Sequence, residues 1–177
     1  MSAARPQANG ARHRAARPGG RPAERGDAFA FHAEGVRYGV LDQLIGYQIR
    51  RAQIAIYEDF FRAVAGTAIT PPLFAALVLI KENRGVNQAT LGRVMGIARS
   101  GVLVLVDRLA AAGLVERRPD PDSRRAKQLY LTGKGASEAR RLEALVLEHD
   151  RRASRRLAAA ERDTLRELLE RFEAGTR

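Results

Sequence analysis

The chain has 177 residues, enough for one domain of ordinary size with a hydrophobic core. Its formal net charge of +11 favours a polyanionic partner, either nucleic acid or an anionic membrane surface, although an arginine-rich solvated surface would give the same excess. The absence of cysteine excludes disulfides and thiolate metal sites, and the longest apolar run, residues 73–80, is too short to span a bilayer.

The first 34 residues are rich in alanine, arginine, proline and glycine and carry almost no aliphatic side chains. Such a segment cannot bury enough apolar surface to offset its ordering entropy, so residues 1–34 are predicted to be a disordered basic tail. The arginines of this tail would either lie along DNA phosphates or have no role, and we favour the second interpretation. The segment has no apolar signal core, so we expect a cytoplasmic protein.

Apolar residues recur at helical spacing from Val36 to about Val64 and fall on more than one face of the predicted helix. A long helix with two apolar faces usually packs against both its own domain and a partner subunit. Residues 35–66 are therefore predicted to be an N-terminal dimerisation helix.

The next segment carries the start and stop signals of three further helices. Thr70 as N-cap and Pro71 at the first helical position begin an almost wholly apolar helix, which we expect to be buried centrally. Asn87 caps a short helix that Gly96 closes, and a third helix follows directly, so the last two helices form a helix-turn-helix. The predicted helices are 71–83, 88–95 and about 99–112.

A hairpin signature follows the helix-turn-helix. Two short runs that contain apolar residues, 114–118 and 127–131, flank a turn-rich, charged tip at residues 119–125. A basic hairpin attached to a helical unit is how a winged helix grips a DNA backbone. Residues 67–131 are therefore predicted to be a winged helix-turn-helix DNA-binding domain.

Two helices are predicted at the end of the chain. Thr132 caps a long helix to about Arg155, and a last helix runs from about Ala159 to Phe172. Their apolar stripes predict that residues 132–177 are C-terminal dimerisation helices, with a monomeric bundle as the alternative. His149 on the long helix is predicted to be solvated or a dimer contact. The expected fold is mainly α with a small β-wing, and the N- and C-terminal helices form the dimer.

This order of elements resembles the MarR family of bacterial transcription regulators. The resemblance covers about residues 39–172 and is strongest in Val-Asp-Arg-Leu at 106–109, Gly-Leu-Val-Glu-Arg at 113–117, Asp-Pro-Asp-Ser-Arg-Arg at 120–125 and Leu-Thr-Gly-Lys-Gly at 131–135. It implies a homodimer that binds a double-stranded palindromic operator, acts as a repressor, and releases DNA when a small molecule binds. An architectural DNA-binding protein without an effector is the alternative.

The second helix of a helix-turn-helix lies in the major groove with its N-terminal residues against base edges. We therefore expect DNA contacts from Arg99, Ser100, Gly101, Leu103 and Val104. Helical spacing puts the opposite, buried face at Val102, Leu105, Val106 and Leu109. If this assignment is one position off, Leu103 and Val104 are core residues instead. Family members commonly carry polar residues near positions 101, 103 and 104, so this chain is expected to use apolar contacts to thymine methyl groups.

The predicted wing supplies Arg124 and Arg125, because an arginine on a wing can enter the narrow minor groove. The alternative is that they only solvate the turn. Family members usually have aspartate directly before the wing arginine, whereas this chain has Ser123, which puts the usual brace in doubt. Arg118 is expected to contact a phosphate or to remain solvated.

The resemblance also implies an effector, often an aromatic acid. Residues 45–53 resemble the first helix of members that sense aromatic acids or their coenzyme A thioesters. Guanidinium groups suit bidentate anion binding and aromatic rings suit an apolar pocket, so the candidate effector residues are Tyr47, Arg50, Arg51, Tyr57 and Phe74. Alternatively, the aromatic residues are ordinary core and the arginines form surface ion pairs.

Enzyme motifs are missing from the sequence. The three histidines are far apart, and there is no His-Glu-x-x-His, no Gly-x-Gly-x-x-Gly after a strand and no Gly-x-Ser-x-Gly. We therefore expect a DNA-binding regulator that is not an enzyme and uses no cofactor or metal.

Overall fold

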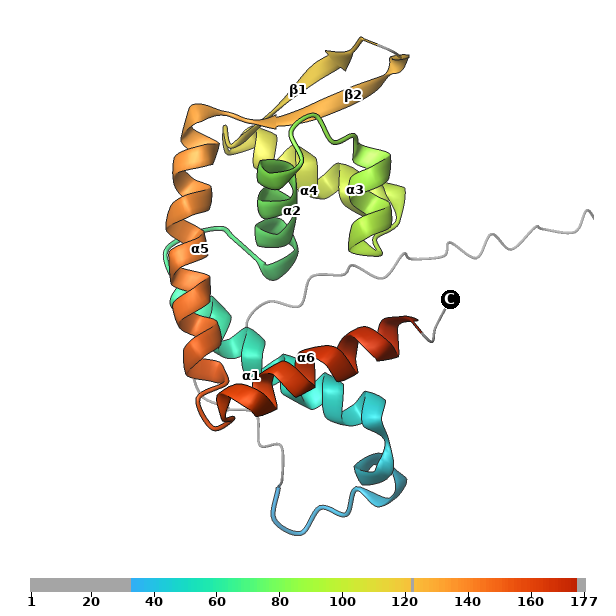
Figure 1. Ribbon diagram of the computed structural model, residues 1–177, viewed down its shortest axis with the longest axis vertical. Helices are drawn as coiled ribbons and strands as arrows, with labels where there is room; N and C mark the ends of the chain where they lie inside the picture. The colour runs from blue at the N-terminus through green and yellow to red at the C-terminus, as the bar shows by residue number, and fades with distance from the viewer. Residues whose placement is uncertain (1–32, 122, 175–177) are drawn as a thin grey trace, which may run out of the picture. The chain divides into compact units, whose positions relative to one another are not determined.

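The computed structural model describes residues 33–121 and 123–174, so the predicted basic tail falls outside the described residues except for its last two. The part of the chain from Tyr38 onwards carries all the elements and is described by itself. Its elements are a 3₁₀-helix η1 (Gly39–Gln43), α1 (Ile45–Ala63), α2 (Pro71–Glu82), α3 (Gln88–Met95), α4 (Arg99–Ala111), β1 (Val115–Asp120), β2 (Ser123–Leu131), α5 (Gly133–Ala153) and α6 (Ala159–Ala174). This mainly helical fold with a two-stranded antiparallel sheet (Figure 1) confirms the predicted fold class.

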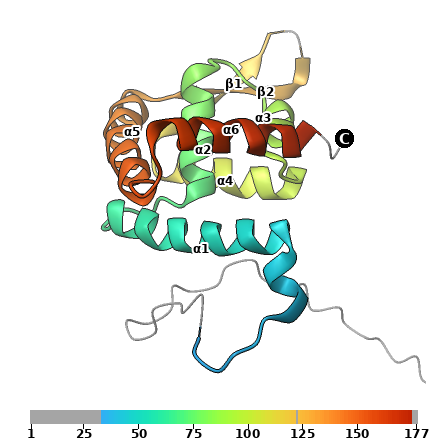
Figure 2. The ribbon, with the colours of Figure 1, turned by 60° about the horizontal axis from the view of Figure 1, so that its bottom comes forward.

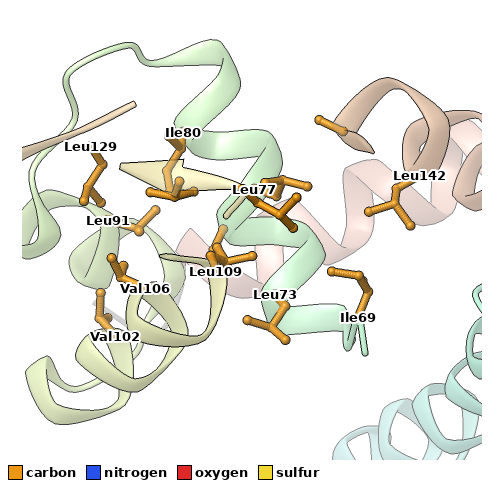
Figure 3. Packing of buried hydrophobic residues seen from close by; sticks show 14 of the residues in the cluster. Ile69, Leu73, Leu77, Ile80, Leu91, Val102, Val106, Leu109, Leu129 and Leu142 are labelled. Carbon is orange, nitrogen blue, oxygen red and sulfur yellow. The ribbon is translucent and has the colours of Figure 1, made fainter. Parts of the chain in front are cut away.

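Helix α2 lies at the centre of the hydrophobic core. It packs against α3, α4, β2 and α5, and its residues Leu73, Leu77 and Ile80 are almost completely buried. Figure 3 shows these side chains directed toward Leu109 of α4 and Leu129 of β2. A helix that is apolar on nearly all sides can satisfy its surface only in such a central position. Each fully buried leucine or isoleucine contributes about 1.5–3 kcal/mol to folding.

The N-terminal helix is shorter than the sequence predicted. Residues 39–43 form a 3₁₀-helix, Leu44 is extended (φ −90°, ψ 116°), and α1 begins only at Ile45. Gly39 has φ +56°, a left-handed backbone that an α-helix does not accommodate. The Gln48 side chain donates a hydrogen bond to the Asp42 carbonyl oxygen at 3.1 Å, across the break. The prediction of a continuous helix from Val36 was therefore wrong.

The hairpin has longer arms and a shorter tip than predicted. β1 extends to Asp120 and β2 begins at Ser123, so most of the predicted tip, residues 119–125, belongs to the strands. The register pairs Val115 with Leu131 and Pro119 with Lys127, and it shifts after Pro119. Strand pairing depends on backbone hydrogen bonds, so it continues through charged residues that carry no hydrophobic pattern.

Two of the three predicted helix caps form as expected. The Asn87 side chain accepts a hydrogen bond from the Thr90 N–H, and Thr132 Oγ1 accepts one from the Gly135 N–H, each at 2.9 Å. Thr70 occupies the N-cap position of α2, but its side chain makes no cap hydrogen bond. Pro71 and Pro72 have no N–H to donate, so only the Leu73 N–H could serve as donor in the first three positions, and it makes no hydrogen bond with the Thr70 side chain.

The first turn of α5 packs directly on the end of α4. Thr132 N–H donates to the Leu114 carbonyl oxygen at 3.0 Å, and Thr132 Oγ1 donates to the Gly113 carbonyl oxygen at 2.7 Å. A Cβ added at Gly135 would overlap the Leu114 carbonyl oxygen, whereas one added at Gly133 would meet nothing within 4 Å. The Leu-Thr-Gly-Lys-Gly motif therefore requires its last glycine and not its first.

These two glycines make a matched pair for mutagenesis. We expect Gly135→Ala to lower the free energy of unfolding by about 2 kcal/mol or more, because the backbone of Leu114 cannot move away without cost. Gly133→Ala should change it by less than about 1 kcal/mol, or raise it, because alanine favours helix. Urea denaturation of both variants checks this, and equal stability of the two would contradict the packing described.

Helices α1 and α5 meet at a buried polar contact. Figure 2 shows the C-terminal end of α1 beside α5. His149 is only 3% exposed, its Nδ1 lies 2.8 Å from Asp59 Oδ2, and its ring packs edge-on against Phe60 at 5.8 Å. The carboxylate can only accept, so Nδ1 donates. The prediction that His149 is solvated or a dimer contact was wrong, because its partner lies 90 residues away in the sequence.

This contact gives a pH-dependent stability. The hydrogen bond from His149, together with a hydrogen bond from Arg152 and the charges of Arg152 and Arg62, lowers the pKa of Asp59 despite the opposing effect of burial. A carboxyl whose pKa is lowered on folding stabilises the fold above its unfolded pKa of about 4, and this stabilisation is lost as the pH falls through the folded pKa.

We therefore expect Asp59→Ala to lower the free energy of unfolding at pH 7 by about 1–3 kcal/mol, because His149 loses its partner. The difference from the wild type should shrink as the pH falls below about 4. Urea denaturation at a series of pH values measures it, with Asp163→Ala, an exposed acid on α6, as control. A difference that stays constant down to pH 3 would contradict the assigned role.

Candidate nucleic-acid interface

A tight turn joins α3 to α4 and bends the pair by 112°. Gly96 ends α3 with φ +63°, and the Ile97 N–H donates to the Gly92 carbonyl oxygen at 2.9 Å. A Cβ at Gly92 would lie 2.9 Å from Val102 Cγ2, so a glycine is needed where the two helices approach. The turn leaves the N-terminal end of α4 projecting from the domain.

The faces of α4 are those that the sequence predicted. Val102, Val106 and Leu109 are at most 1% exposed, whereas Leu103 is 49% and Val104 57% exposed. The alternative in which Leu103 and Val104 belong to the core is therefore wrong. The start of α4 presents an arginine, a serine and two apolar side chains to solvent.

A groove of about 750 Å³ brings the predicted contact residues together with two other elements. Arg99, Ser100 and Leu103 line one side, the start of α3 at residues 87–89 lines another, and Lys127 of β2 closes it. Gly101 does not line the groove but faces Ile97 in the turn before α4. A Cβ at position 101 would lie 2.7 Å from Ile97 Cγ2. Any contact that Gly101 makes outside the domain would be through its backbone.

Gln88 is a candidate residue that the sequence analysis missed. It lines the same groove, and its Nε2 is buried with no hydrogen-bond partner among the described residues. Buried amide groups are almost always paired, so an unpaired one facing a groove favours an external acceptor. Gln88 is also the first residue of α3, where free backbone N–H groups favour anions. The only sequence signal was its place after the Asn87 cap.

The base of the wing is fixed by backbone hydrogen bonds to the α2–α3 loop. Gly85 N–H donates to the Leu129 carbonyl oxygen at 3.0 Å, and Leu129 N–H donates to the Val86 carbonyl oxygen at 2.9 Å. The Leu129 side chain is fully buried. β2 is thus attached to the helix-turn-helix, and this attachment sets the direction in which the wing leaves the domain.

The two arginines of β1 form ion pairs with acids of the same chain. Arg118 forms an ion pair with Glu116 and lies over the Tyr130 ring, with its guanidinium carbon 4.4 Å from the ring centroid. Arg117 forms an ion pair with Asp107 of α4. Arg118 remains 57% exposed, so its predicted contact with a phosphate stays a prediction.

The backbones of Arg124 and Arg125 lie in β2, next to its first residue Ser123. Their side chains lie outside the described residues. The two residues belong to an arm of the hairpin and not to its turn. Their predicted insertion into a minor groove remains a prediction.

The candidate effector residues fall into two groups along α1. Arg51 lies over the Tyr47 ring at 5.8 Å and 3.9 Å from an Asp42 oxygen, and its side chain is 13% exposed. Two turns farther along, Tyr57 contacts Phe61 edge-on. The second group continues to α2, where Phe74 packs against Phe60 with ring centroids 6.3 Å apart. Arg50 is exposed.

Metal sites and membrane-spanning helices are two other kinds of feature that a chain of this size can carry. Residues 33–121 and 123–174 contain no group of three or more histidine or acidic side chains that could hold a metal ion. No single described helix is long and apolar enough to cross a membrane. One pair, α3 with α4, passes that test by length and composition, but it is bent by 112° at the turn.

Comparison with known proteins identifies the family. The MarR family model matches residues 69–127, from the start of α2 to β2. The chain is also 35% identical over 136 residues to the putative transcriptional regulatory protein for the hcr operon of Thauera aromatica, covering 76% of this chain and 82% of that protein. The chain belongs to the MarR family of transcriptional regulators. The family resemblance seen in the sequence is therefore confirmed, as is the expectation of a regulator and not an enzyme.

Solved structures of the family show the same fold. The transcriptional repressor CouR, bound to a 23-mer DNA duplex, has a TM-score of 0.74 and 34% identity, covering 78% of this chain and 98% of CouR. CouR bound to p-coumaroyl-CoA gives a TM-score of 0.72. The PcaV regulator of Streptomyces coelicolor, in complex with its natural ligand, has a TM-score of 0.71 and 28% identity, covering 77% of this chain and 96% of PcaV.

For this MarR-family chain we expect Arg99→Ala to weaken binding to its DNA site by about 1–3 kcal/mol and to relax base preference at one position. The reason is the place of Arg99 at the exposed start of α4, on the groove. Fluorescence anisotropy at fixed salt measures the affinity. Arg140→Ala, an exposed arginine on α5 with the same loss of charge, is the control. Equal weakening by the two variants would mean that only overall charge matters.

Proposed function

We propose that the protein is a ligand-responsive repressor that binds a palindromic operator as a homodimer and releases it when a small aromatic acid or its coenzyme A thioester binds. The observation that carries the DNA-binding part is the groove that unites the exposed start of α4, the start of α3 and Lys127 of the wing. The likeness to CouR, a repressor solved on DNA, supports the same conclusion.

Exposed apolar side chains support the dimer. Clusters of large apolar residues are more than one-third exposed both at the N-terminal helices and on α6, and exposed patches of this kind mark interaction surfaces. The N-terminal cluster comprises Val40, Leu41, Leu44, Ile45 and Ile49, and the α6 cluster comprises Leu165, Leu168, Leu169 and Phe172. In a dimer that binds two successive major grooves, the two α4 helices would lie about 34–36 Å apart.

Within the proposed complex, each part of the groove has a distinct role. Arg99 hydrogen-bonds a guanine edge, Ser100 contacts a base or phosphate, and Leu103 contacts thymine methyl groups. Arg124 and Arg125 reach the adjacent minor groove from the wing. Gln88 at the start of α3 donates to a phosphate, which would give its buried Nε2 the acceptor that it lacks.

Two observations support the proposed binding of an effector: a ligand-bound structure of a relative and the side chains of α1. CouR has been solved with p-coumaroyl-CoA, a thioester of an aromatic acid. Arg51 stacks on Tyr47, and its ion pair with Asp42 is long, at 3.9 Å. The planar Arg51 guanidinium suits bidentate binding of a ligand carboxylate. The apolar part of the ligand would lie near Tyr57 and Phe74.

Binding measurements test the regulator against the alternative of an architectural DNA-binding protein. At fixed salt, the dimer should prefer an operator found by footprinting its own upstream region over random DNA by a factor of about 10³ or more. The apolar side chains Leu103 and Val104 are the feature that favours the alternative. Little preference between the two DNAs would support that alternative and contradict the proposal.

A titration tests the effector. We expect p-coumarate or p-coumaroyl-CoA to bind the purified dimer in calorimetry and to lower its operator affinity by about tenfold or more, which corresponds to a coupling free energy near 1.4 kcal/mol. Arg51→Gln should weaken that release, whereas Arg140→Gln should leave it unchanged. If neither compound nor related aromatic acids and thioesters alter operator affinity, the effector part is wrong.

A further inference from the structure

A cavity of about 490 Å³ lies between the second half of α1 and the turn from α5 to α6. Four arginines and one acid line it, together with small apolar residues. With all five groups ionised, four positive charges and one negative charge leave a net charge of +3. The charged residues are Arg62, Arg152, Arg155, Arg156 and Asp59. Nothing in the DNA-binding groove or the candidate effector set includes these residues.

Asp59 cannot neutralise the positive charge of this cavity, because its carboxylate already interacts with three side chains. Asp59 accepts from His149 at 2.8 Å and from Arg152 at 2.9 Å, and it lies 3.2 Å from Arg62. Asp59 therefore balances only part of the charge of its two arginine neighbours. Arg155 and Arg156 form no ion pair with any residue in the described part of the chain.

The walls of the cavity limit the kind of ligand. Ala55, Ala153 and Ile56 are exposed and make up the apolar part of the lining. The lining offers many donors and one occupied acceptor, so the ligand has to be rich in acceptors and multiply negative. Phosphate oxygens fit best, because the planar guanidinium binds two of them side by side.

We propose that this cavity binds the phosphate groups of a nucleotide-type small molecule, namely the nucleotide end of a coenzyme A thioester effector. This inference rests on the effector part of the proposed function and narrows it. It favours the thioester over the free aromatic acid, which carries a single carboxylate and no phosphate.

A continuous set of contacts connects the arginine cavity with the aromatic residues predicted to bind the effector. Phe74 packs on Phe60 at 6.3 Å, and Phe60 packs on the His149 ring at 5.8 Å. His149 in turn holds Asp59, which lines the cavity. Phosphates in the cavity and an aryl group near Phe74 would therefore lie at opposite ends of this chain of packed side chains.

Calorimetry on the full-length, DNA-free protein tests the site with coenzyme A as the probe. We expect the double variant Arg155→Gln/Arg156→Gln to raise the dissociation constant by about tenfold or more, because two charge-assisted contacts are lost. The matched control Arg93→Gln/Arg140→Gln removes two exposed arginines outside the cavity and should change it by less than about threefold. Equal affinity of the wild type and the Arg155/Arg156 variant would overturn the proposal.

Three further probes separate the possible sources of the phosphate. Dephospho-coenzyme A and ADP should bind more weakly than coenzyme A, with the same dependence on Arg155 and Arg156, and p-coumarate should show none. ADP binding as tightly as coenzyme A would overturn the thioester assignment in favour of a free nucleotide. If the wild type binds no phosphate compound and the double variant loses its dimer in gel filtration, the cavity holds acids of the second copy and the proposal fails.

The operator assay distinguishes this inference from the proposed function. Release of the operator by p-coumarate without any arginine-dependent binding of coenzyme A would overturn the cavity assignment and leave the proposed repressor standing. Arginine-dependent binding of coenzyme A with no change of operator affinity by p-coumaroyl-CoA would show that the cavity binds phosphate groups but would overturn its assignment to an effector.

Discussion

The close contact between the Leu114 carbonyl and the first turn of α5 is the constraint on which the arrangement of the chain depends. Leu114 follows α4 and precedes the wing, so the Thr132 hydrogen bonds to residues 113 and 114 join the ends of the hairpin to the helix that leaves it. The absence of a side chain at Gly135 allows this approach. Because α5 begins at this junction and the base of β2 is bonded to Gly85 and Val86, the wing, α4 and α5 have a fixed relation to one another.

Helix α5 extends from this junction to the cavity that Arg152, Arg155 and Arg156 line. Its 21 residues span about 31 Å at 1.5 Å per residue, from Thr132 at the wing to Arg152 beside Asp59. At its far end the buried His149 holds α1 through Asp59. A ligand that draws Arg62 or Arg152 away from Asp59 would alter the polar contacts of Asp59, where α1 meets α5. Helix α5 therefore runs from the base of the wing to the cavity lined by Arg152.

The sequence predicted those features that depend on neighbouring residues and missed those that depend on distant ones. The Asn87 and Thr132 caps, the Gly96 turn and the two faces of α4 follow from spacings of a few residues, and all were correct. The contact between His149 and Asp59 joins residues 90 positions apart, and no periodicity shows it. The sequence analysis also did not predict that the strands extend into the charged residues of the hairpin. Strand pairing there depends on backbone hydrogen bonds, which a hydrophobic pattern does not reveal. The break at Leu44 was missed because the apolar spacing continues through it.

The apolar surface of α4 explains why the proposed repressor needs two copies. One well-placed bidentate contact, such as that of Arg99 with guanine, gives about 1–3 kcal/mol of base discrimination. Specific sites are typically about 4–10 kcal/mol better than random DNA. Leu103 and Val104 offer methyl contacts and no hydrogen bonds, so the direct readout of a single subunit falls short of that range. In the proposed complex, two subunits on a palindrome would double every contact, and the wing arginines would add discrimination by reading minor-groove width. The exposed apolar clusters at the N-terminal helices and on α6 are then as necessary for specificity as the groove itself.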